Sequence, residues 1–492
     1  MSFNEKLQRL IDERAVISSG GPSVSKERLE LLFDSGSFIE TGAFVKQRPT
    51  EYAFAESAGY EPVITGWGTI EGAPVYAFSQ DASTMSGAVS EMHAKKICNI
   101  LDLAAKTGSP VVGFIDTKGA KLAEGIDALN GYAAIIAGLS RISGVVPTIA
   151  VVNGPCGGAG AVMVECFDFV IMDKAAELYI NSPQIISAVS GKTAECAKAE
   201  NNAKCGSAQF VAESDAASAG IARAIIAYLP QNNAGDRVFV QSADDLNRQL
   251  AIEGFIPDNN YDSVDMYGIV RELADKGEYL EVSSVFGTGM LCAFARLDGD
   301  TAGIIANRSD IDIDGANKAA RFISLCDSLD IPIITLVDAG GFPFCANFEN
   351  NGGVKAVARL SMAYAQATVP KISVVVRKAY GSAYVAMCSK GLGADVAFAL
   401  PCAEISVMPL ESAVNIIFSD EIAMSDNPIT EREVICEKYR DILTSPYEAA
   451  KRGYIDDIII PAELRQRVIY AAELLSVKRD DSLPKKHSSL PL

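Results

Sequence analysis

A predicted strand meets a glycine-rich turn in the segment Asn153-Gly154-Pro155-Cys156-Gly157-Gly158-Ala159-Gly160-Ala161-Val162. The run from Val145 to Val152 that leads into it is apolar and rich in β-branched residues, which is typical of a buried strand. The glycines and the small residues after them predict a tight turn and then a helix. Backbone without side chains lets a ligand approach closely, and amides at a helix N-terminus attract negative charge. The segment therefore indicates either an oxyanion site or close packing of a strand against a helix.

The composition is that of an acidic globular chain. Its 492 residues are 49% hydrophobic and carry a formal net charge of −19, so there is room for about two or three domains with full cores. The negative charge argues against general binding to nucleic acid or to an anionic membrane. The charged, amphipathic N-terminus and the lack of an apolar run of about 18 residues predict neither a signal peptide nor a membrane span.

Cysteine and histidine usage narrows the chemistry further. The sequence has 11 cysteines without a CxxC pair or a zinc-like spacing, which predicts reduced, buried thiols in a cytoplasmic protein. The only two histidines are His93 and His487. Histidine-based triads, zinc ribbons and histidine-rich metal sites are therefore not expected, and we expect no metal in this chain. Carboxylates, backbone amides or a group brought by the substrate must do the chemistry.

The two halves of the chain repeat each other at an offset of 222 to 227 residues. Short apolar runs alternate with helical patterns of about ten to fifteen residues in each half, which predicts βαβ units and buried, mostly parallel strands. We expect an α/β fold with two tandem domains, at residues 1–255 and 256–492. The matching positions include Pro110/Pro332, Asp116/Asp338, Pro147/Pro370, Asp168/Asp395 and Glu177/Glu404.

An ordered set of motifs resembles one known family over nearly the whole chain. The motifs are Glu91-Met-His-Ala-Lys-Lys-Ile-Cys, Asp116-Thr-Lys-Gly-Ala-Lys-Leu-Ala-Glu-Gly, Gly154-Pro-Cys-Gly-Gly, Val337-Asp-Ala-Gly-Gly-Phe, Ala367-Thr-Val-Pro-Lys, Arg377-Lys-Ala-Tyr-Gly-Ser-Ala-Tyr and Ala403-Glu-Ile-Ser-Val-Met. They are similar to those of the carboxyltransferase (β) subunits of biotin-dependent acyl-CoA carboxylases, of the propionyl-CoA carboxylase β and transcarboxylase large-subunit types.

The resemblance implies a fold, partners and an assembly. It implies two tandem crotonase-like domains of the ClpP/crotonase superfamily, built from β-β-α superhelical turns. Acyl-CoA would lie on the N-terminal half, and biotin would enter beside the C-terminal half of another subunit of a homo-oligomer, commonly a hexamer. Because the chain has no Met-Lys-Met biotin-attachment motif, biotin would be carried by a separate biotin carboxyl carrier protein. The further partner would be a biotin carboxylase or a membrane decarboxylase subunit.

Carboxyl transfer fits a chain that is poor in histidine. The reaction needs an enolate at the thioester and a stabilised ureido oxyanion, and backbone amides can hold both. The duplicated turns offer two amide pairs, Gly158-Ala159 and Ser382-Ala383. Which pair would serve the thioester and which the biotin stays open.

The resemblance also assigns surrounding residues. Gly119 and Ala120 would contribute to the acyl-CoA side of the pocket. Lysines near this site are candidates for the CoA phosphates, although they could equally be solvated helix-face charges; they are Lys95, Lys96, Lys118 and Lys121. The biotin side would be framed by Arg377, Tyr380, Gly381, Tyr384 and Val385.

Departures from the family pattern keep alternatives open. The usual Ser-Gly-Gly-Ala-Arg is Thr117-Lys118-Gly119-Ala120-Lys121, and Ala159 and Ser382 stand where the family usually has glycine. The alternatives are transfer within an acyl-CoA decarboxylase complex with a membrane partner, a catalytically impaired scaffold subunit, and a hydratase that uses paired glutamates such as Glu165 and Glu177. Asp116 and Asp338 could be bases or turn-capping residues, and Cys156 a nucleophile or a buried thiol.

Overall fold

The computed structural model describes residues 2–18, 23–49, 59–192, 195–242, 244–259, 261–480, 483 and 489. His487 lies outside these residues. The chain divides into two compact units, 1–236 and 237–492. The boundary expected between residues 255 and 256 falls within the second unit. Leu250 and Ile252 belong to the hydrophobic core of that unit, and the Leu250 N–H donates to the Ala462 carbonyl, so residues 237–255 pack with the second half.

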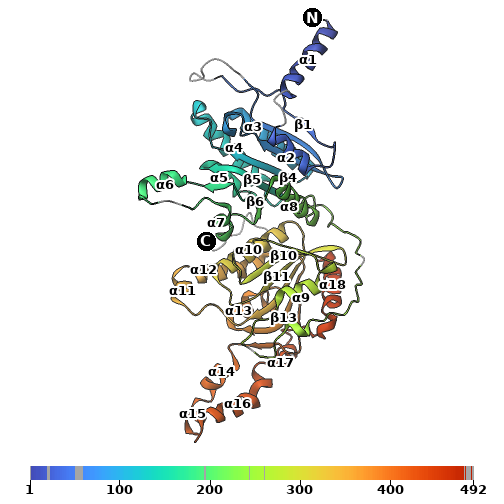
Figure 1. Cartoon of the computed structure of the whole chain (residues 1–492). Coiled ribbons are helices and arrows are strands. Elements are labelled where there is room, and N and C mark those ends of the chain that lie inside the picture. The colour runs from blue at the N-terminus through green and yellow to red at the C-terminus, as the bar shows by residue number, and fades with distance from the viewer. Residues whose placement is uncertain are drawn as a thin grey trace. The chain divides into compact units, whose positions relative to one another are not determined.

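The first unit is built on one eight-stranded sheet (Figure 1). Its strands are β1 (Ile39–Thr41), β2 (Val63–Ile70), β3 (Ala73–Gln80), β4 (Val111–Thr117), β5 (Thr148–Gly157), β6 (Phe169–Asp173), β7 (Glu177–Tyr179) and β8 (Phe210–Ala212). Its α-helices are α1 (Phe3–Ser18), α2 (Val24–Leu32), α3 (Glu91–Thr107), α4 (Ile126–Ile142), α5 (Ala159–Val164), α6 (Pro183–Ser190), α7 (Ala199–Lys204) and α8 (Asp215–Tyr228). The strand order is β1-β2-β3-β4-β5-β6-β8, and β7 pairs with β5.

The second unit repeats this plan in its own eight-stranded sheet. Its strands are β9 (Tyr279–Glu281), β10 (Met290–Leu297), β11 (Asp300–Asn307), β12 (Ile333–Ala339), β13 (Lys371–Tyr380), β14 (Val396–Ala399), β15 (Glu404–Ser406) and β16 (Asp457–Ile458). Its α-helices are α9 (Met266–Leu273), α10 (Ile313–Ser328), α11 (Ala346–Asn350), α12 (Gly353–Gln366), α13 (Gly381–Ala386), α14 (Leu410–Ile417), α15 (Ser419–Met424), α16 (Pro428–Leu443), α17 (Pro446–Lys451) and α18 (Leu464–Leu474). The order is β16-β14-β13-β12-β11-β10-β9, and β15 pairs with β13.

Buried β-branched strands explain the centre of each sheet. In β5, the side chains of Ile149 and Val152 are fully buried, and β5 pairs in parallel with both β4 and β6. Parallel strands are covered on both faces, so they form continuous apolar runs. Helices α3 and α4 pack together in the first unit, as α10 and α12 do in the second. The carboxyl ends of the central strands β5 and β13 therefore lie at equivalent edges of the two sheets.

Helix capping repeats between the halves as well. The Ser90 hydroxyl accepts a hydrogen bond from the His93 N–H at the start of α3, and the Asp312 carboxylate accepts one from the Gly315 N–H at the start of α10. Such caps satisfy N–H groups that the helix itself leaves unpaired. The repeat found in the sequence is thus also a repeat of local structure.

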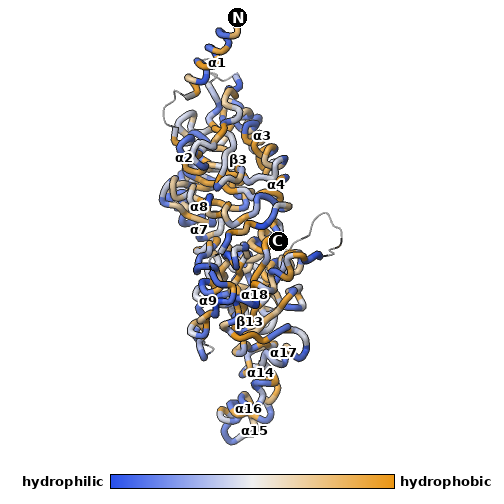
Figure 2. Tube along the Cα trace, turned by 90° about the vertical axis from the view of Figure 1, so that its right-hand side faces the viewer, coloured by the Kyte–Doolittle hydropathy of each residue, from blue (hydrophilic) through white to orange (hydrophobic). Residues whose placement is uncertain are grey.

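Two helical segments stand apart from the sheets. Helices α14, α15 and α16 of the second unit lie beyond its sheet (Figure 1) and share a small core of their own, formed by Leu410, Val414, Ile435 and Cys436. Helix α1 alternates between hydrophobic and hydrophilic residues, as the changing colours along its tube show (Figure 2). Within the described ranges, no helix is long and apolar enough to cross a membrane.

Candidate active site: two amide turns

The first turn follows β5. Gly158 adopts φ 59°, a left-handed conformation that favours glycine, and α5 begins at Ala159. Gly154 has a different constraint, because a Cβ there would lie 2.1 Å from the Asp116 Oδ1. Glycine is therefore needed at Gly158 for the backbone conformation and at Gly154 for the close approach to a neighbouring carboxylate.

The sheet uses one of the two amides predicted for this turn. The Gly158 N–H donates to the Tyr179 carbonyl over 2.9 Å, which extends the ladder between β5 and β7. The N–H groups of Ala159 and Gly160 occupy the first two positions of α5, where helix geometry provides no acceptor. The donors that this turn can offer to a ligand are therefore those of Ala159 and Gly160, one position later than expected.

A further amide follows the neighbouring strand. Residues 117 and 156 are Cα partners in β4 and β5, so the segments after them leave the sheet at the same edge. The Gly119 carbonyl accepts a hydrogen bond from the Val89 N–H, and the backbone N–H of Lys121 donates to the Val89 carbonyl, both over 2.9 Å. The N–H of Ala120, between them, points away from Val89 because successive residues of an extended segment face opposite sides. The sequence placed Ala120 in the acyl-CoA pocket but not as an amide donor.

The second turn has the same construction at an offset of 223 residues. β5 ends at Gly157 and β13 at Tyr380, and Gly158 and Gly381 adopt φ 59° and 55°. Ser382 and Ala383 lie in the first turn of α13, where their N–H groups have no intrahelical acceptor. They correspond to Ala159 and Gly160, which supports the shift of the first pair. The Ser382 residue is exposed and Ala383 is buried.

The lysines proposed for CoA phosphates have different surroundings. Lys118 is exposed, and Lys95 is exposed but pairs with Glu91 over 2.9 Å. The Lys121 ammonium lies 3.1 Å from the buried Glu124 carboxylate. Lys96 is buried, its Nζ donates to the Val63 carbonyl, and burial lowers its pKa to about 8. Lys96 does not suit a phosphate contact, because its ammonium is directed into the protein.

The residues predicted for the biotin side divide into buried supports and accessible positions. Arg377 is buried and binds the Asp338 carboxylate, with Nη2 to Oδ2 at 2.9 Å, and it also donates to the Asn259 and Asp262 carbonyls. The Arg377 guanidinium therefore supports the end of β12 and does not face a ligand. Tyr384 is partly buried, and Val385 is 47% exposed.

The two strand-end aspartates have equivalent structural partners. Asp116 accepts from Arg28 over 3.0 Å in the first unit, and Asp338 is held by Arg377 in the second. Each of the two carboxylates is thus held in place by a charged hydrogen bond from a guanidinium. These contacts support the structural interpretation of both aspartates.

The thiol and imidazole near the first turn are inert. Cys156 is fully buried, and burial raises the pKa of its thiol to about 12. His93 is also fully buried beside Gln80, and burial, together with the charge of Lys96, lowers its pKa to about 3. Neither group is available as a nucleophile or a general base near neutral pH. Among the described residues there is no cluster of histidine, cysteine and acidic side chains that could hold a metal ion.

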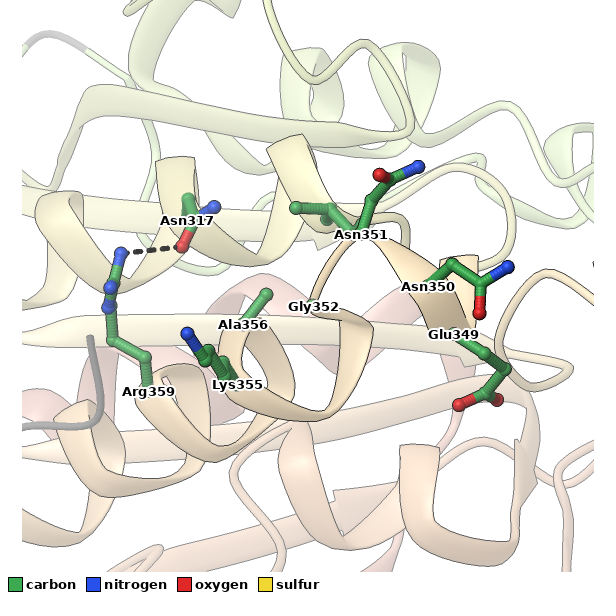
Figure 3. Close-up of a pocket in the computed structure, with 9 residues that line it drawn as sticks. Asn317, Glu349, Asn350, Asn351, Gly352, Lys355, Ala356 and Arg359 are labelled. Atoms are coloured by element: carbon green, nitrogen blue, oxygen red, sulfur yellow. Dashed lines mark hydrogen bonds between the residues drawn. The ribbon is translucent and has the colours of Figure 1, made fainter. Parts of the chain in front are cut away.

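A cavity of about 460 Å³ lies elsewhere in the second unit, between α10 and the α11–α12 segment (Figure 3). Lys355 and Arg359 of α12 line one wall, and the Arg359 guanidinium donates to the Asn317 side-chain carbonyl of α10 over 2.8 Å. None of the residues predicted for acyl-CoA or biotin lines this cavity. The candidate site is therefore the pair of amide turns, whose positions follow from strand register.

Comparison with known proteins identifies the class of protein to which these two turns belong. The Carboxyl transferase domain family matches residues 18–490, so the chain is a member of that family. This confirms the resemblance drawn from the motifs.

The similarity to individual relatives covers nearly the full length of both chains. The chain is 40% identical to the methylmalonyl-CoA decarboxylase subunit alpha of Propionigenium modestum, covering 96% of this chain and 94% of the relative. It is 38% identical to the methylmalonyl-CoA carboxyltransferase 12S subunit of Propionibacterium freudenreichii subsp. shermanii (99% and 97%). It is 36% identical to the propionyl-CoA carboxylase beta chain of Saccharopolyspora erythraea (98% and 93%).

A solved structure agrees with the fold. The transcarboxylase 12S structure with methylmalonyl-CoA and methylmalonic acid bound superposes with a TM-score of 0.97 at 38% identity, covering 100% of this chain and 99% of that one. The two tandem crotonase-like units expected from the sequence are thereby confirmed.

Proposed function

We propose that this chain is a carboxyltransferase subunit that moves a carboxyl group between biotin on a separate carrier protein and the α-carbon of a short acyl-CoA. The observation that carries the proposal is the duplicated turn, with free helix-start amides after β5 and again after β13. The reaction has two oxyanions to stabilise, the enolate of the thioester and the ureido oxygen of biotin. Two amide sites match that requirement without histidine, metal or a catalytic thiol.

In this proposal, the first unit receives the acyl-CoA. The N–H groups of Ala120 and Ala159 converge from two adjacent strand ends on the thioester oxygen and stabilise the enolate, with Gly160 beside them. Lys118, whose side chain is exposed, meets a phosphate of CoA, while Lys95 and Lys121 contribute less because carboxylates already pair with them. Gly119 keeps the approach to the thioester open, since its φ of 117° suits a residue without a side chain.

The second unit receives biotin. When it is bound, biotin would supply the carboxyl group and take up the α-proton of the acyl-CoA. The N–H groups of Ser382 and Ala383 would hold its ureido oxygen. Tyr384 and Val385, on the same short helix, would line the biotin side, and Val385 would influence which acyl group is accepted. Gly381, Tyr380 and Arg377 shape and support the turn from behind. The fit to biotin rests on these amides, which have no acceptor within their own helix.

The assembly is part of the proposal. The related transcarboxylase 12S structure is described as a hexamer assembly, and we propose that this chain also forms a homo-oligomer in which one subunit's first unit faces another's second unit. Biotin would arrive on a biotin carboxyl carrier protein, and the chain would act in the cytoplasm.

A decarboxylase complex is the second candidate, and a specific observation favours it. Two relatives, from Propionigenium modestum and Veillonella parvula, are methylmalonyl-CoA decarboxylase alpha subunits, at 40% and 38% identity. In such a complex the same two turns would work in the direction that removes the carboxyl group from the acyl-CoA, and a membrane subunit would be the partner; in a carboxylase, the partner would be a biotin carboxylase.

A transfer assay with the purified full chain tests the proposal. Free biotin or a biotinylated carrier is offered with malonyl-, methylmalonyl- or glutaconyl-CoA, and we expect loss of the carboxyl group from at least one ester. Absence of turnover together with absence of CoA-ester binding in calorimetry would favour the scaffold alternative. Addition of water to crotonyl-CoA would favour a hydratase.

A further inference from the structure

A tyrosine ring lies beside each amide turn, but it comes from opposite strands in the two halves. Gly157 and Tyr179 are Cα partners between β5 and β7, and Tyr380 and Ser406 are partners between β13 and β15. A Cβ at Gly157 would lie 2.5 Å from the Tyr179 ring, so the small residue is required opposite the large one. Each half therefore has one tyrosine in this pair of facing positions, on β7 in the first unit and on β13 in the second.

The hydroxyl groups of the two tyrosines have different partners. The Tyr380 hydroxyl donates to the Glu404 carboxylate, and burial, followed by that carboxylate, raises the pKa of the tyrosine well above its usual range. Glu404 also accepts from Arg440 Nη1 of α16 over 3.1 Å. For Tyr179, no hydrogen-bond partner of the hydroxyl is found in the part of the chain that the structure describes. Of these two tyrosine hydroxyls, that of Tyr380 is therefore the one that a hydrogen bond to a carboxylate anchors within the described residues.

The backbone of Val407 lies close to the same turn. Gly381 has φ 55°, and a Cβ at this position would lie 3.0 Å from the Val407 carbonyl. Val407 follows β15 directly and leads into α14, so the segment after Glu404 leaves little room for a side chain at the turn that follows Tyr380. The α14–α16 segment (Figure 1) is therefore linked to the turn that carries the Ser382 and Ala383 amides through the Arg440–Glu404–Tyr380 side chains.

We propose that Tyr380 and Glu404 are positioning residues that hold the Ser382 and Ala383 amides in the geometry needed for carboxyl transfer. Their link to Arg440 makes that geometry depend on the placement of α16. A hydrogen bond to a charged, partly buried carboxylate is strong and directional, which suits it to fixing the end of a strand. The inference rests on the proposed function of the second turn, because it assigns these residues to the support of that turn.

The test compares four variants of the full chain in the transfer assay. Tyr380→Phe keeps the ring and removes the hydroxyl, so we expect kcat to fall about tenfold with an unchanged KM for the acyl-CoA. Glu404→Leu should cause a similar loss, whereas Glu404→Gln retains an acceptor and should stay within about threefold of wild type. The double variant Tyr380→Phe/Glu404→Leu should be no slower than Glu404→Leu alone, because both changes remove the same contact.

Tyr179→Phe is the matched control, since it removes the equivalent hydroxyl from the first unit. It should leave kcat unchanged. Wild-type kcat in Tyr380→Phe, or equal losses in Tyr380→Phe and Tyr179→Phe, overturns the inference. Additive losses in the double variant overturn it as well.

Hydrogen exchange separates this inference from the proposed function. We expect faster amide exchange in the peptide that contains residues 380–386 in Tyr380→Phe than in wild type, and no change there in Tyr179→Phe. If the wild-type chain transfers no carboxyl group but this exchange difference appears, the proposed function fails while the support of the turn stands. If wild type is active and the exchange is identical in both variants, the positioning role is refuted.

Discussion

Replacement of Ala159 by proline removes one amide donor from the first turn while leaving the turn's fold nearly untouched. Ala159 is the first residue of α5, a position at which proline is favoured because its missing N–H has no helical acceptor. The preceding residue is Gly158, which has no Cβ to clash with the proline ring. The change therefore costs little stability, since it breaks no helical hydrogen bond.

The expected kinetic effect is large. Loss of one preorganised oxyanion donor costs about 3 kcal/mol of transition-state stabilisation, which is about a hundredfold in kcat. The Ala120 and Gly160 amides would remain, so residual activity should persist. Ala159→Gly is the control, because it keeps the N–H and restores the glycine usual in the family. We expect near wild-type kcat for Ala159→Gly.

The assay is steady-state carboxyl transfer, with thermal unfolding measured in parallel. An Ala159→Pro variant that folds normally and transfers the carboxyl group at the wild-type rate would refute the assignment of this amide. A loss confined to KM would also contradict it, because an interaction made only in the transition state lowers kcat.

Three other predictions address the surroundings of the first turn. Gly154→Ala should lower the free energy of unfolding by about 2 kcal/mol, because its Cβ would lie 2.1 Å from the Asp116 Oδ1. Urea denaturation measures this change, and an unchanged unfolding midpoint would contradict the close approach. Burial lowers the pKa of His93 from 6.5 to about 3. As the pH falls from 6.5 towards 3, the unfolded chain therefore binds a proton that the native state does not, and the free energy of unfolding drops by about 1.4 kcal/mol per pH unit. A His93→Gln variant should show a correspondingly shallower fall, and an identical pH slope would exclude this contribution. Lys118→Ala should weaken CoA-ester binding about threefold in calorimetry at low salt, whereas Lys106→Ala should not; equal affinities would remove Lys118 from the CoA site.

The sequence was sufficient to predict the architecture because its signals are local. The run from Val145 to Val152 is apolar and β-branched, and the same pattern recurs before Tyr380, so both central strands and their repeat could be recognised. Residues 237–255 carry no comparable signal. Their packing against the second core depends on Leu250 and Ile252, whose partners are distant in the chain.

The site was predicted less completely, since it depends on which groups the sheet already uses. Gly158 looked like a free amide, but its N–H pairs with the Tyr179 carbonyl of β7, a strand that follows only after α5 and β6. Lys95 and Lys96 are neighbours in the sequence, yet only the second faces the interior. Arg377 lies in a motif whose resemblance placed it on the biotin side, but its guanidinium binds the Asp338 carboxylate. Each outcome follows from a tertiary contact that spacing alone does not reveal.

The most direct test of the central claim is to follow a radiolabelled carboxyl group from methylmalonyl-CoA to the biotin of the carrier protein. We predict that the wild-type chain places the label on biotin. Ala159→Pro, which removes an amide from the first turn, and Ser382→Pro, which removes one from the second, should each slow this transfer by about a hundredfold. Transfer at the wild-type rate in both variants would contradict the account that two amide turns carry the reaction.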